Sequence, residues 1–224
     1  MTAWSYSSIK TFEQCPKKYF HLKVAKDVKD TPGEAAEYGT AVHEAAEHYV
    51  RSGKPIPEKF AYIRPAVERL AALPGEKHAE LKLGVTKASW GYDPCDFFDK
   101  DVWWRGIADL LIIDGDRAWC VDYKTGKNAK YADTKQLDLL AGAVFVHFPQ
   151  VRKVRSSLLY VVSGELIPKV HVAEDRDEYL SVFDEQLDGL DSAMESGVFN
   201  PKSGPLCSFC PVVECEHWRP RRRY

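Results

Sequence analysis

Two carboxylates and an amine lie close together in the stretch GIADLLIIDGDRAWCVDYKTG, residues 106–126. Asp109 and Asp122 occupy positions where a buried strand would carry Val or Ile, and Lys124 follows two residues after Asp122. Carboxylate oxygens of this kind suit a hard divalent cation, with water completing its coordination shell. Such an ion can orient and activate water against a phosphodiester, while a neighbouring ammonium stabilises the developing charge.

The hairpin that carries these groups predicts how they face one another. With Gly115-Asp116 as a two-residue type II′ turn, Asp109 lies directly opposite Asp122, with the Cβ atoms roughly 5 Å apart. A turn at Asp114-Gly115 would make the two acids diagonal neighbours on the same face. Lys124, two residues beyond Asp122, points to that face as well. An isolated DxK is most often a solvated surface hairpin, but opposed acids on a partly buried face favour a bound cation between them.

Composition places the chain among ordinary globular proteins. Its 224 residues are 45% hydrophobic and 12% aromatic, which supports one large domain, or one domain with appendages, around a real core. The formal net charge of −2 says little about partners, because a nucleic-acid binder can gather its basic residues on one face. No apolar run is long enough to span a bilayer, and residues 1–20 carry no signal-peptide pattern. We therefore expect a cytoplasmic protein without membrane partners, whose six cysteines are core residues or metal ligands rather than disulfides.

Hydrophobic periodicity and capping residues predict the order of the elements. The order is helices, then strands, then helix, then strands, then helix, which predicts an α/β fold with a central mixed β-sheet flanked by helices. Residues 89–104 read as a loop that leads into the hairpin. Besides the hairpin, we expect helices over about 5–13, 31–52, 57–72 and 175–196, a helix opened by a capping box at Asp133, and strands over about 78–88, 153–163 and 166–172.

The hairpin resembles the core of the PD-(D/E)XK nuclease superfamily, in which an Asp on one strand and D/E-x-K on the next form the active site. Asp109 in GIADLLI would be the first acid, and Asp122 and Lys124 in VDYKTG would complete the motif. The resemblance implies a restriction-endonuclease-like core and metal-dependent hydrolysis of DNA.

Further motifs resemble RecB-type exonucleases. SYSSIKTFEQCPKKYF looks like their opening motif, and GTAVHEAAEHY looks like their histidine motif. The resemblance implies that His43 binds Mg²⁺ or Mn²⁺ together with the two hairpin acids, although a core or surface histidine also fits its place on the helix. Gln136 matches a Gln that contacts the DNA and the site, whereas Leu140 replaces the Tyr of that motif. Glu80 weakly matches an acid found upstream in some relatives.

Three cysteines in the tail form a compact pattern, Cys207-x2-Cys210-x4-Cys215, which is a strong metal signal in a cytosolic protein. A tetrahedral metal or a cubane cluster needs four ligands. The RecB-like arrangement has one N-terminal and three C-terminal cysteines, which implies that Cys15 is the fourth and that a [4Fe–4S] cluster joins the two ends of the chain. Zn²⁺ is the alternative, and His217 could then replace one thiol.

Basic and aromatic residues gather near these cysteines, which is typical of a channel for single-stranded nucleic acid. A basic tail beside ordinary core aromatics is the simpler interpretation. The residues are Lys17, Lys18, Tyr19, Phe20, Phe209, Trp218, Arg219, Arg221, Arg222 and Arg223. Lys127, Lys130 and Arg105 could also bind phosphate, although solvated surface charge is the usual role of such residues.

Together these features predict a RecB-like nuclease domain over residues 1–224, with a core at about 31–196 and cluster-binding segments at about 1–30 and 197–224. We expect a metal-dependent deoxyribonuclease, acting as an exonuclease on single-stranded DNA or DNA ends, in a bacterial, archaeal or phage-infected cell. The partners expected besides DNA are a second copy of the chain or proteins of recombination, repair or CRISPR adaptation. The alternatives are a non-catalytic, cysteine-metal-stapled DNA-binding module and a structure-specific endonuclease.

Overall fold

The chain divides into two compact units. The computed structural model describes residues 3–31, 33–127, 129–130 and 132–220. The core unit is Gly33–Val182, and the terminal unit combines Met1–Pro32 with Phe183–Tyr224. The core unit is therefore shorter than the core expected at about 31–196, and the single nuclease domain over the whole chain stays a prediction.

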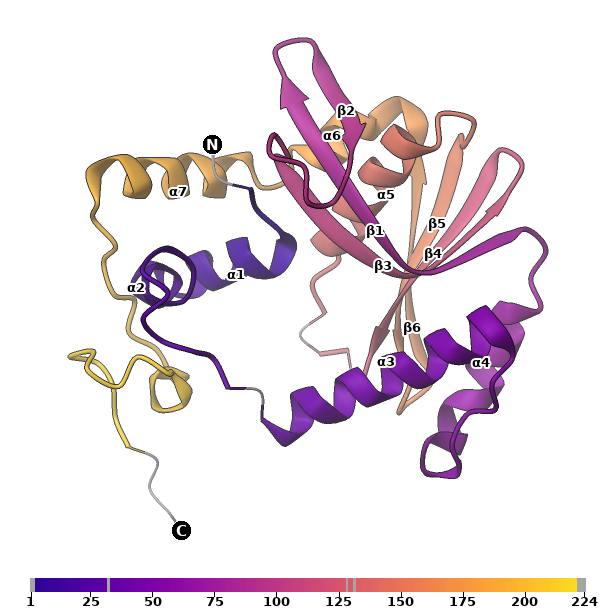
Figure 1. Ribbon diagram of the computed structural model, residues 1–224, viewed down its shortest axis with the longest axis horizontal. Helices are drawn as coiled ribbons and strands as arrows, with labels where there is room; N and C mark the ends of the chain where they lie inside the picture. Colours follow the sequence, from indigo (N-terminus) through magenta and orange to yellow (C-terminus); the bar gives the residue numbers. More distant parts are fainter. Residues whose placement is uncertain (1–2, 32, 128, 131, 221–224) are drawn as a thin grey trace. The chain divides into compact units, whose positions relative to one another are not determined.

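A six-stranded sheet forms the centre of the core unit (Figure 1). Its order is β2-β1-β3-β4-β5-β6, and β4 and β5 pair in parallel whereas all other neighbours are antiparallel. The strands are β1 (Glu76–Ala88), β2 (Gly91–Cys95), β3 (Trp104–Asp114), β4 (Arg117–Lys124), β5 (Lys153–Tyr160) and β6 (Glu165–Val172). The predicted mixed sheet is confirmed.

The β3–β4 hairpin has the predicted turn, because Asp114 pairs with Arg117 across it. Gly115 has φ of +60°, the left-handed conformation that type I′ and II′ turns require at their first central residue. The ladder continues in the same register to its last pair, Leu110 with Val121. The predicted register is confirmed as far as this pair, and Asp109 and Asp122 are the next residues of the two strands, beyond the end of the ladder.

Helices cover both faces of the sheet (Figure 1). Side chains alternate along the end of β5 and the next residue, Val161: Leu159 and Val161 pack in the cluster with α3, η2 and α4, whereas Leu158 and Tyr160 pack with Leu137 of α5 on the other face. The helices of the core unit are α3 (Glu34–Ser52), η2 (Glu58–Ile63), α4 (Arg64–Ala71), α5 (Lys135–His147), η3 (Ala173–Asp175) and α6 (Arg176–Leu180). The predicted α/β architecture, a sheet between helices, is confirmed.

Residues 89–104 are only partly a loop, contrary to the prediction. Residues Gly91–Cys95 form β2, which pairs antiparallel with β1 from Gly84 to Ala88. The Gly-, Asp- and Pro-rich composition argued against a strand, but β2 is an edge strand, where a proline such as Pro94 is tolerated.

The helix expected over about 175–196 is interrupted. Helix α6 ends at Leu180, and α7 (Asp184–Ser196) begins after Phe183. Leu180 packs against Gly142 of α5 in the core unit, while Phe183 makes edge-to-face contacts with the rings of Trp4 and Tyr6 in the terminal unit. The prediction of one helix was wrong because the chain passes from one unit to the other within it.

The predicted starts of two helices, at about residue 31 and at Asp133, have mixed outcomes. The expected start at Thr31-Pro32-Gly33-Glu34 includes Pro32, which lies outside the described residues, and α3 begins at Glu34 with Gly33 as its N-cap. Thr134 is the N-cap of α5, but its side chain makes no capping hydrogen bond. Asp133 Oδ1 instead accepts from Lys135 N at 3.0 Å, so the box at Asp133 was wrong while the helix was right.

The terminal unit packs short helices around a small aromatic core. It contains α1 (Tyr6–Gln14), α2 (Pro16–Tyr19), η1 (Phe20–Val24), α7 and η4 (Cys207–Phe209). Ser5 and Ser8 form a reciprocal capping box at the start of α1, and Ile9 is fully buried. No helix in the described part of the chain combines the length and the apolar composition that crossing a membrane requires.

Candidate active site

Strands β3 and β4 separate where the hairpin acids begin. Their ladder ends at Leu110 and Val121, and Tyr123 pairs onward with β5 in the parallel register. The carboxylate of Asp109 takes the place of a ladder acceptor, because its Oδ2 accepts a hydrogen bond from Tyr123 N at 2.7 Å. The backbone therefore fixes the orientation of this acid at the fork between the two strands.

His43 approaches the same fork from helix α3. Its Nε2 donates to the carbonyl oxygen of Tyr123 at 3.0 Å, and its Nδ1 lies 3.4 Å from Asp109 Oδ2. A proton held on Nε2 by a carbonyl leaves the lone pair of a neutral imidazole on Nδ1, facing the carboxylate. The imidazole is thus positioned to serve as a nitrogen ligand.

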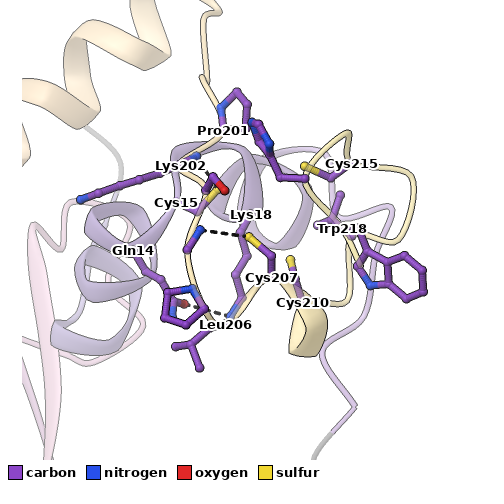
Figure 2. A pocket seen from close by; sticks show the side chains of 15 residues that line it. Gln14, Cys15, Lys18, Pro201, Lys202, Leu206, Cys207, Cys210, Cys215 and Trp218 are labelled. Carbon is purple, nitrogen blue, oxygen red and sulfur yellow. Dashed lines mark hydrogen bonds between the residues drawn. The ribbon is translucent and has the colours of Figure 1, made fainter. Parts of the chain in front are cut away.

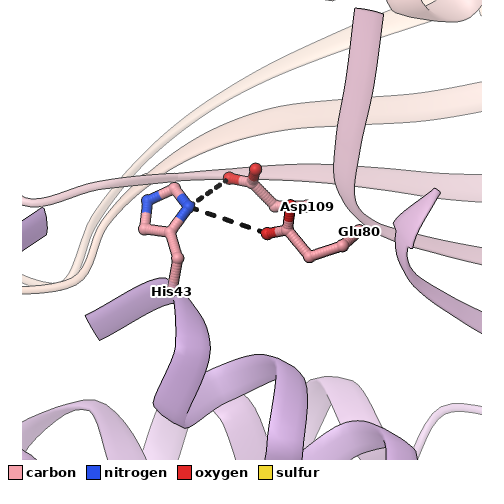
Figure 3. Close-up of side chains that lie close together, drawn as sticks. All are labelled: His43, Glu80 and Asp109. Carbon is pink, nitrogen blue, oxygen red and sulfur yellow. Dashed lines mark ion pairs between the residues drawn. The ribbon is translucent and has the colours of Figure 1, made fainter. Parts of the chain in front are cut away.

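Glu80 joins these two residues from β1, as Figure 3 shows. Its Oε1 lies 4.0 Å from His43 Nδ1, and the ligand atoms of Glu80, His43 and Asp109 all lie within 4.8 Å of one another. Glu80 has φ of +52°, a conformation that costs a residue with a side chain about 1–2 kcal/mol. Backbone strain of this kind is found preferentially at functional sites.

The charges of this cluster are not balanced. Burial and the negative charge of Asp109 raise the pKa of Glu80, against the effect of His43. Burial disfavours the charged form of His43, but the contact with Asp109 and the charges of Asp109, Asp122 and Glu80 outweigh it and raise its pKa. A carboxylate pair that shares one imidazole has an excess of negative charge, which a divalent cation would neutralise.

Asp122 and Lys124 form a second set beside the cluster. Asp122 is 4% exposed, and its Oδ1 accepts from Gln136 Nε2 at 2.6 Å. Asp122 Oδ2 is buried and lies 2.7 Å from Lys124 Nζ, so the two side chains form an ion pair. Burial and the charge of Asp109 raise the pKa of Asp122 to about 6, with Lys124 opposing the shift.

Gln136 completes this set from the first turn of α5. Its Oε1 accepts from Lys124 Nζ at 2.9 Å while its amide donates to Asp122. The side chain therefore holds the ammonium and the carboxylate in fixed positions relative to each other. Leu140, which stands where the related motif has Tyr, is a core residue with 2% exposure.

The structure gathers the predicted site residues, but in a different grouping. His43 and Asp109 lie together as expected, and Glu80, the weakest sequence match, is the acid that joins them. Asp122 pairs with Lys124 and Gln136 instead of joining that three-residue set. The backbone of Tyr123, which orients both the histidine and the first acid, was missed because a backbone group leaves no signal in the sequence.

The four cysteines line one cavity of about 300 Å³ in the terminal unit (Figure 2). Backbone N–H groups point at two of the sulfurs: Lys202 N lies 3.4 Å from Cys15 Sγ, and Gly204 N lies 3.3 Å from Cys207 Sγ. Such N–H···S contacts stabilise thiolate ligands of metal clusters. Cys210 and Cys215 supply the other two sulfurs of the lining.

The spacing of these sulfurs exceeds what one small ion requires. A zinc ion with Zn–S bonds near 2.3 Å brings its sulfur ligands within about 4.6 Å of one another. Across the described residues, the set of His43, Glu80 and Asp109 is the one group of three ligand atoms within 4.8 Å. No three of the cysteine sulfurs are that close.

Only some of the basic and aromatic residues predicted to form a channel near the cysteines are accessible to a nucleic acid. Tyr19 is buried and packs edge-to-face on Phe12, so it is a core residue. Lys17 is held by Glu216 at 2.6 Å, although Phe209 is exposed. Residues 221–223 lie outside the described residues.

A mixed sheet whose central fork collects a histidine, three carboxylates and a lysine is the arrangement of a metal-dependent nuclease. The sequence model described as the PD-(D/E)XK nuclease superfamily matches residues 3–215. Because this match spans almost the whole chain, the protein belongs to the PD-(D/E)XK nuclease superfamily.

Solved structures show weaker likenesses. The crystal structure of SSO0001 has 12% sequence identity and a TM-score of 0.42, with 98% of this chain and 89% of the other covered. A protein of Eubacterium rectale described as a candidate exonuclease has 14% identity and a TM-score of 0.45 over the same shares of the two chains. Among curated proteins, no sequence matches this chain.

Proposed function

We propose that this protein is a metal-dependent deoxyribonuclease of the RecB-like type, which hydrolyses phosphodiester bonds as an exonuclease on single-stranded DNA or DNA ends. Membership of the nuclease superfamily supports hydrolysis. The choice of DNA, of single strands and of ends follows from the RecB-like motifs around Cys15, His43 and Gln136.

One observation carries this proposal: the half-buried set of His43, Glu80 and Asp109 lies beside the ion pair of Asp122 and Lys124. The donor set fits Mg²⁺ or Mn²⁺, because it offers carboxylate oxygens and one imidazole nitrogen with an excess of negative charge. Asp122, which pairs with Lys124 through its Oδ2, is a further carboxylate that such an ion could use.

The residues of the chain divide the chemical work. A bound divalent ion would polarise the phosphate and lower the pKa of its water. His43, Asp109, Asp122 and Glu80 would hold that ion. Lys124, which Asp122 and Gln136 keep in place, directs its ammonium to the fork and would stabilise the charge that develops on the phosphate.

Digestion of single-stranded oligonucleotides labelled at either end, with Mg²⁺ or Mn²⁺, tests this proposal. We expect cleavage that requires the metal and that proceeds from one end, so a circular single strand of the same sequence stays intact. Cleavage of the circle would favour the structure-specific endonuclease. Binding of DNA without any metal-dependent cleavage would favour the non-catalytic binding module.

We further propose that Cys15, Cys207, Cys210 and Cys215 hold a [4Fe–4S] cluster, which would connect the N-terminal helices with the tail. The wide spacing of the sulfurs and the N–H donors to Cys15 and Cys207 support a cluster over a single Zn²⁺. The cluster would have a structural role, since hydrolysis involves no electron transfer.

Metal analysis of anaerobically purified protein tests the cluster. We expect a brown protein with about four irons and four acid-labile sulfides per chain, as the cubane formula requires, and loss of both in Cys215→Ser. Cys95→Ser is the matched control, because Cys95 ends β2 in the core unit and is not part of the cavity lining. Stoichiometric zinc without sulfide would overturn the cluster.

A further inference from the structure

An exposed aromatic side chain stands on the loop between β2 and β3. Phe98 is 75% exposed, and its ring lies edge-to-face with that of Phe97 at a centroid distance of 5.0 Å. The ammonium of Lys82 lies 5.5 Å from the Phe98 ring centre and 5.8 Å from that of Phe97, and the guanidinium of Arg105 lies 5.6 Å from Phe97. We name these four residues the Phe98 platform.

The platform is built on a well-held loop. Asp99 N donates to Asp96 O at 3.0 Å, and Trp103 N donates to Val85 O at 2.9 Å. The loop backbone packs so closely on β1 that a Cβ on Gly84 would lie 2.7 Å from Asp96 O. Trp103 is buried as well, so the loop presents Phe98 from a fixed base. The ordered loop thus holds the Phe98 ring at the surface, where a ligand can reach it.

The register of the sheet connects the platform with the active site. Arg105, Ile107 and Asp109 alternate along β3 and share one face. Lys82 is paired with Ile107, and both side chains are exposed. From Asp109 to Arg105 is four residues, or about 13 Å at roughly 3.3 Å per residue. This is the length of about four stacked nucleotides at ~3.4 Å each.

Aromatic rings beside cations bind single-stranded nucleic acids, because the rings stack on bases and the cations contact phosphates. The charge around the platform is mixed, since Asp96 and Asp99 line the same hollow as Lys82, Phe97 and Phe98. These acids repel the phosphate backbone, so phosphate contacts are limited to Lys82 and Arg105. Stacking on Phe98 is therefore the main contribution expected.

We propose that the Phe98 platform binds a base of a single-stranded nucleic acid about four nucleotides from the bond that is cut. The position of the cut rests on the proposed nuclease function, whereas the stacking itself does not. The platform would hold the strand beside the exposed side chains of Lys82 and Ile107 and direct it towards Asp109.

Binding of a fluorescent single-stranded oligonucleotide in EDTA, followed by anisotropy, tests the platform without cleavage. We expect Phe98→Ala to weaken binding roughly 5- to 100-fold, because one stacked base contributes that much, and Phe98→Trp to retain it. An oligonucleotide without bases should bind wild type and Phe98→Ala alike. Leu166→Ala, which removes another exposed apolar side chain from β6, is the control and should bind as wild type does. Lys82→Ala should lower the slope of log affinity against log salt by about 0.7.

The outcomes separate this inference from the proposed function. Equal binding by wild type and Phe98→Ala would overturn the platform, even if both proteins cut DNA, and would leave a protein ligand as the occupant of this surface. Binding that depends on Phe98 in a protein that never cleaves would support the platform and overturn the nuclease activity. In a cleaving enzyme, we expect Phe98→Ala to raise KM more than it lowers kcat, and only for strands longer than about four nucleotides.

Discussion

Two histidine–carboxylate groups in the core unit look alike in composition and differ in how their charges are balanced. In the candidate active site, one imidazole faces two carboxylates, because His43 Nδ1 lies 3.4 Å from Asp109 Oδ2 and 4.0 Å from Glu80 Oε1. In the second group, which we name the Asp138 network, Asp138 accepts from Lys169 and from the buried His171 at 2.7 Å. The ligand atoms of the first group could therefore hold a metal ion, whereas both carboxylate oxygens of Asp138 already accept hydrogen bonds.

The pKa values follow this difference. Burial raises the pKa of Glu80 and of Asp122, with Asp109 adding to both shifts. Burial acts in the same direction on Asp138, but hydrogen bonds from His171 and Lys169 outweigh it and lower its pKa. A carboxylate whose charge is satisfied stabilises the fold, whereas unsatisfied carboxylates at a fork between strands are available for a cation.

The remaining partners confirm the structural character of the Asp138 network. His171 Nδ1 contacts Ser156 Oγ at 3.1 Å, and the ring of Tyr179 packs edge-to-face on His171 at 4.7 Å. Ser156, His171 and Asp138 are arranged like a catalytic triad, but Ser156 is 1% exposed and His171 is fully buried. No substrate can reach this hydroxyl, so the network is part of the packing.

The largest expected difference is in the rate of cleavage, which substitutions in the candidate active site should lower and a substitution in the Asp138 network should not. We predict that Lys124→Ala and Asp122→Asn lower metal-dependent cleavage about 100- to 1000-fold, because each removes charge at the reacting phosphate. Asp138→Asn should keep the wild-type rate when it is measured at 25 °C and normalised to the folded fraction. Cleavage that survives Lys124→Ala would remove this residue from the site.

The free energy of unfolding should respond in the opposite way, with the larger loss in the Asp138 network. We predict that Asp138→Asn lowers the free energy of unfolding by about 3 kcal/mol, because it leaves the donors of His171 and Lys169 without their anionic partner. Asp122→Asn should leave stability unchanged or raise it in EDTA at pH 8, since the fold disfavours that charge. Urea unfolding of the three proteins measures both effects, and equal losses in both variants would contradict the comparison.

A bound metal should stabilise the active-site cluster in a way that depends on pH. The pKa of Asp122 is raised to about 6, so its protonated form stabilises the fold at low pH, and this contribution is lost as the pH rises through 6. Above that pH, a divalent ion would take the place of the proton in neutralising the carboxylate. At 100 times its dissociation constant, Mn²⁺ should add about 2.7 kcal/mol, or roughly 5–10 °C in Tm, at pH 8. The shift at pH 5 should be much smaller, and a shift that is equal at both pH values would contradict this assignment.

Acid unfolding should reveal the Asp138 network by a smaller effect. The pKa of Asp138 is lowered in the fold, so its contribution to stability is complete above the ordinary pKa near 3.9 and is lost as the pH falls through the lower, folded value. We predict that the stability difference between wild type and Asp138→Asn narrows below about pH 4 and is constant from pH 5 to 8. Urea midpoints across this range measure it, and a difference that widens in acid would contradict the sign.

Local chemistry made the hairpin predictable. The turn needs a residue such as Gly115 at positive φ, and the register from Asp114–Arg117 to Leu110–Val121 then follows without any knowledge of the rest of the chain. Strand β2 and the break after Leu180 could not be predicted in this way. Strand β2 forms because pairing with β1 overrides its poor strand propensity. The helix breaks after Leu180 because the residues on either side of the break pack in two different units.

The same limit applies to the site. Asp122, Lys124 and His43 could be proposed from motifs because their spacing along the chain is informative. Glu80 lies in the site because its backbone is left-handed and interrupts the β1–β3 ladder. No pattern in the sequence predicts this backbone conformation. Asp138 is 33 residues from His171, so only the folded chain distinguishes its saturated network from an active site.

Calorimetric titration of Mn²⁺ into wild type, Asp109→Asn and Asp138→Asn, with cleavage measured on the same samples, is the most direct test of a catalytic cation at the β3–β4 fork. We predict one or two bound ions in wild type and in Asp138→Asn, with at least tenfold weaker binding and no cleavage in Asp109→Asn. Undiminished Mn²⁺ affinity in Asp109→Asn, or cleavage by wild type in EDTA, would contradict a catalytic cation at this fork.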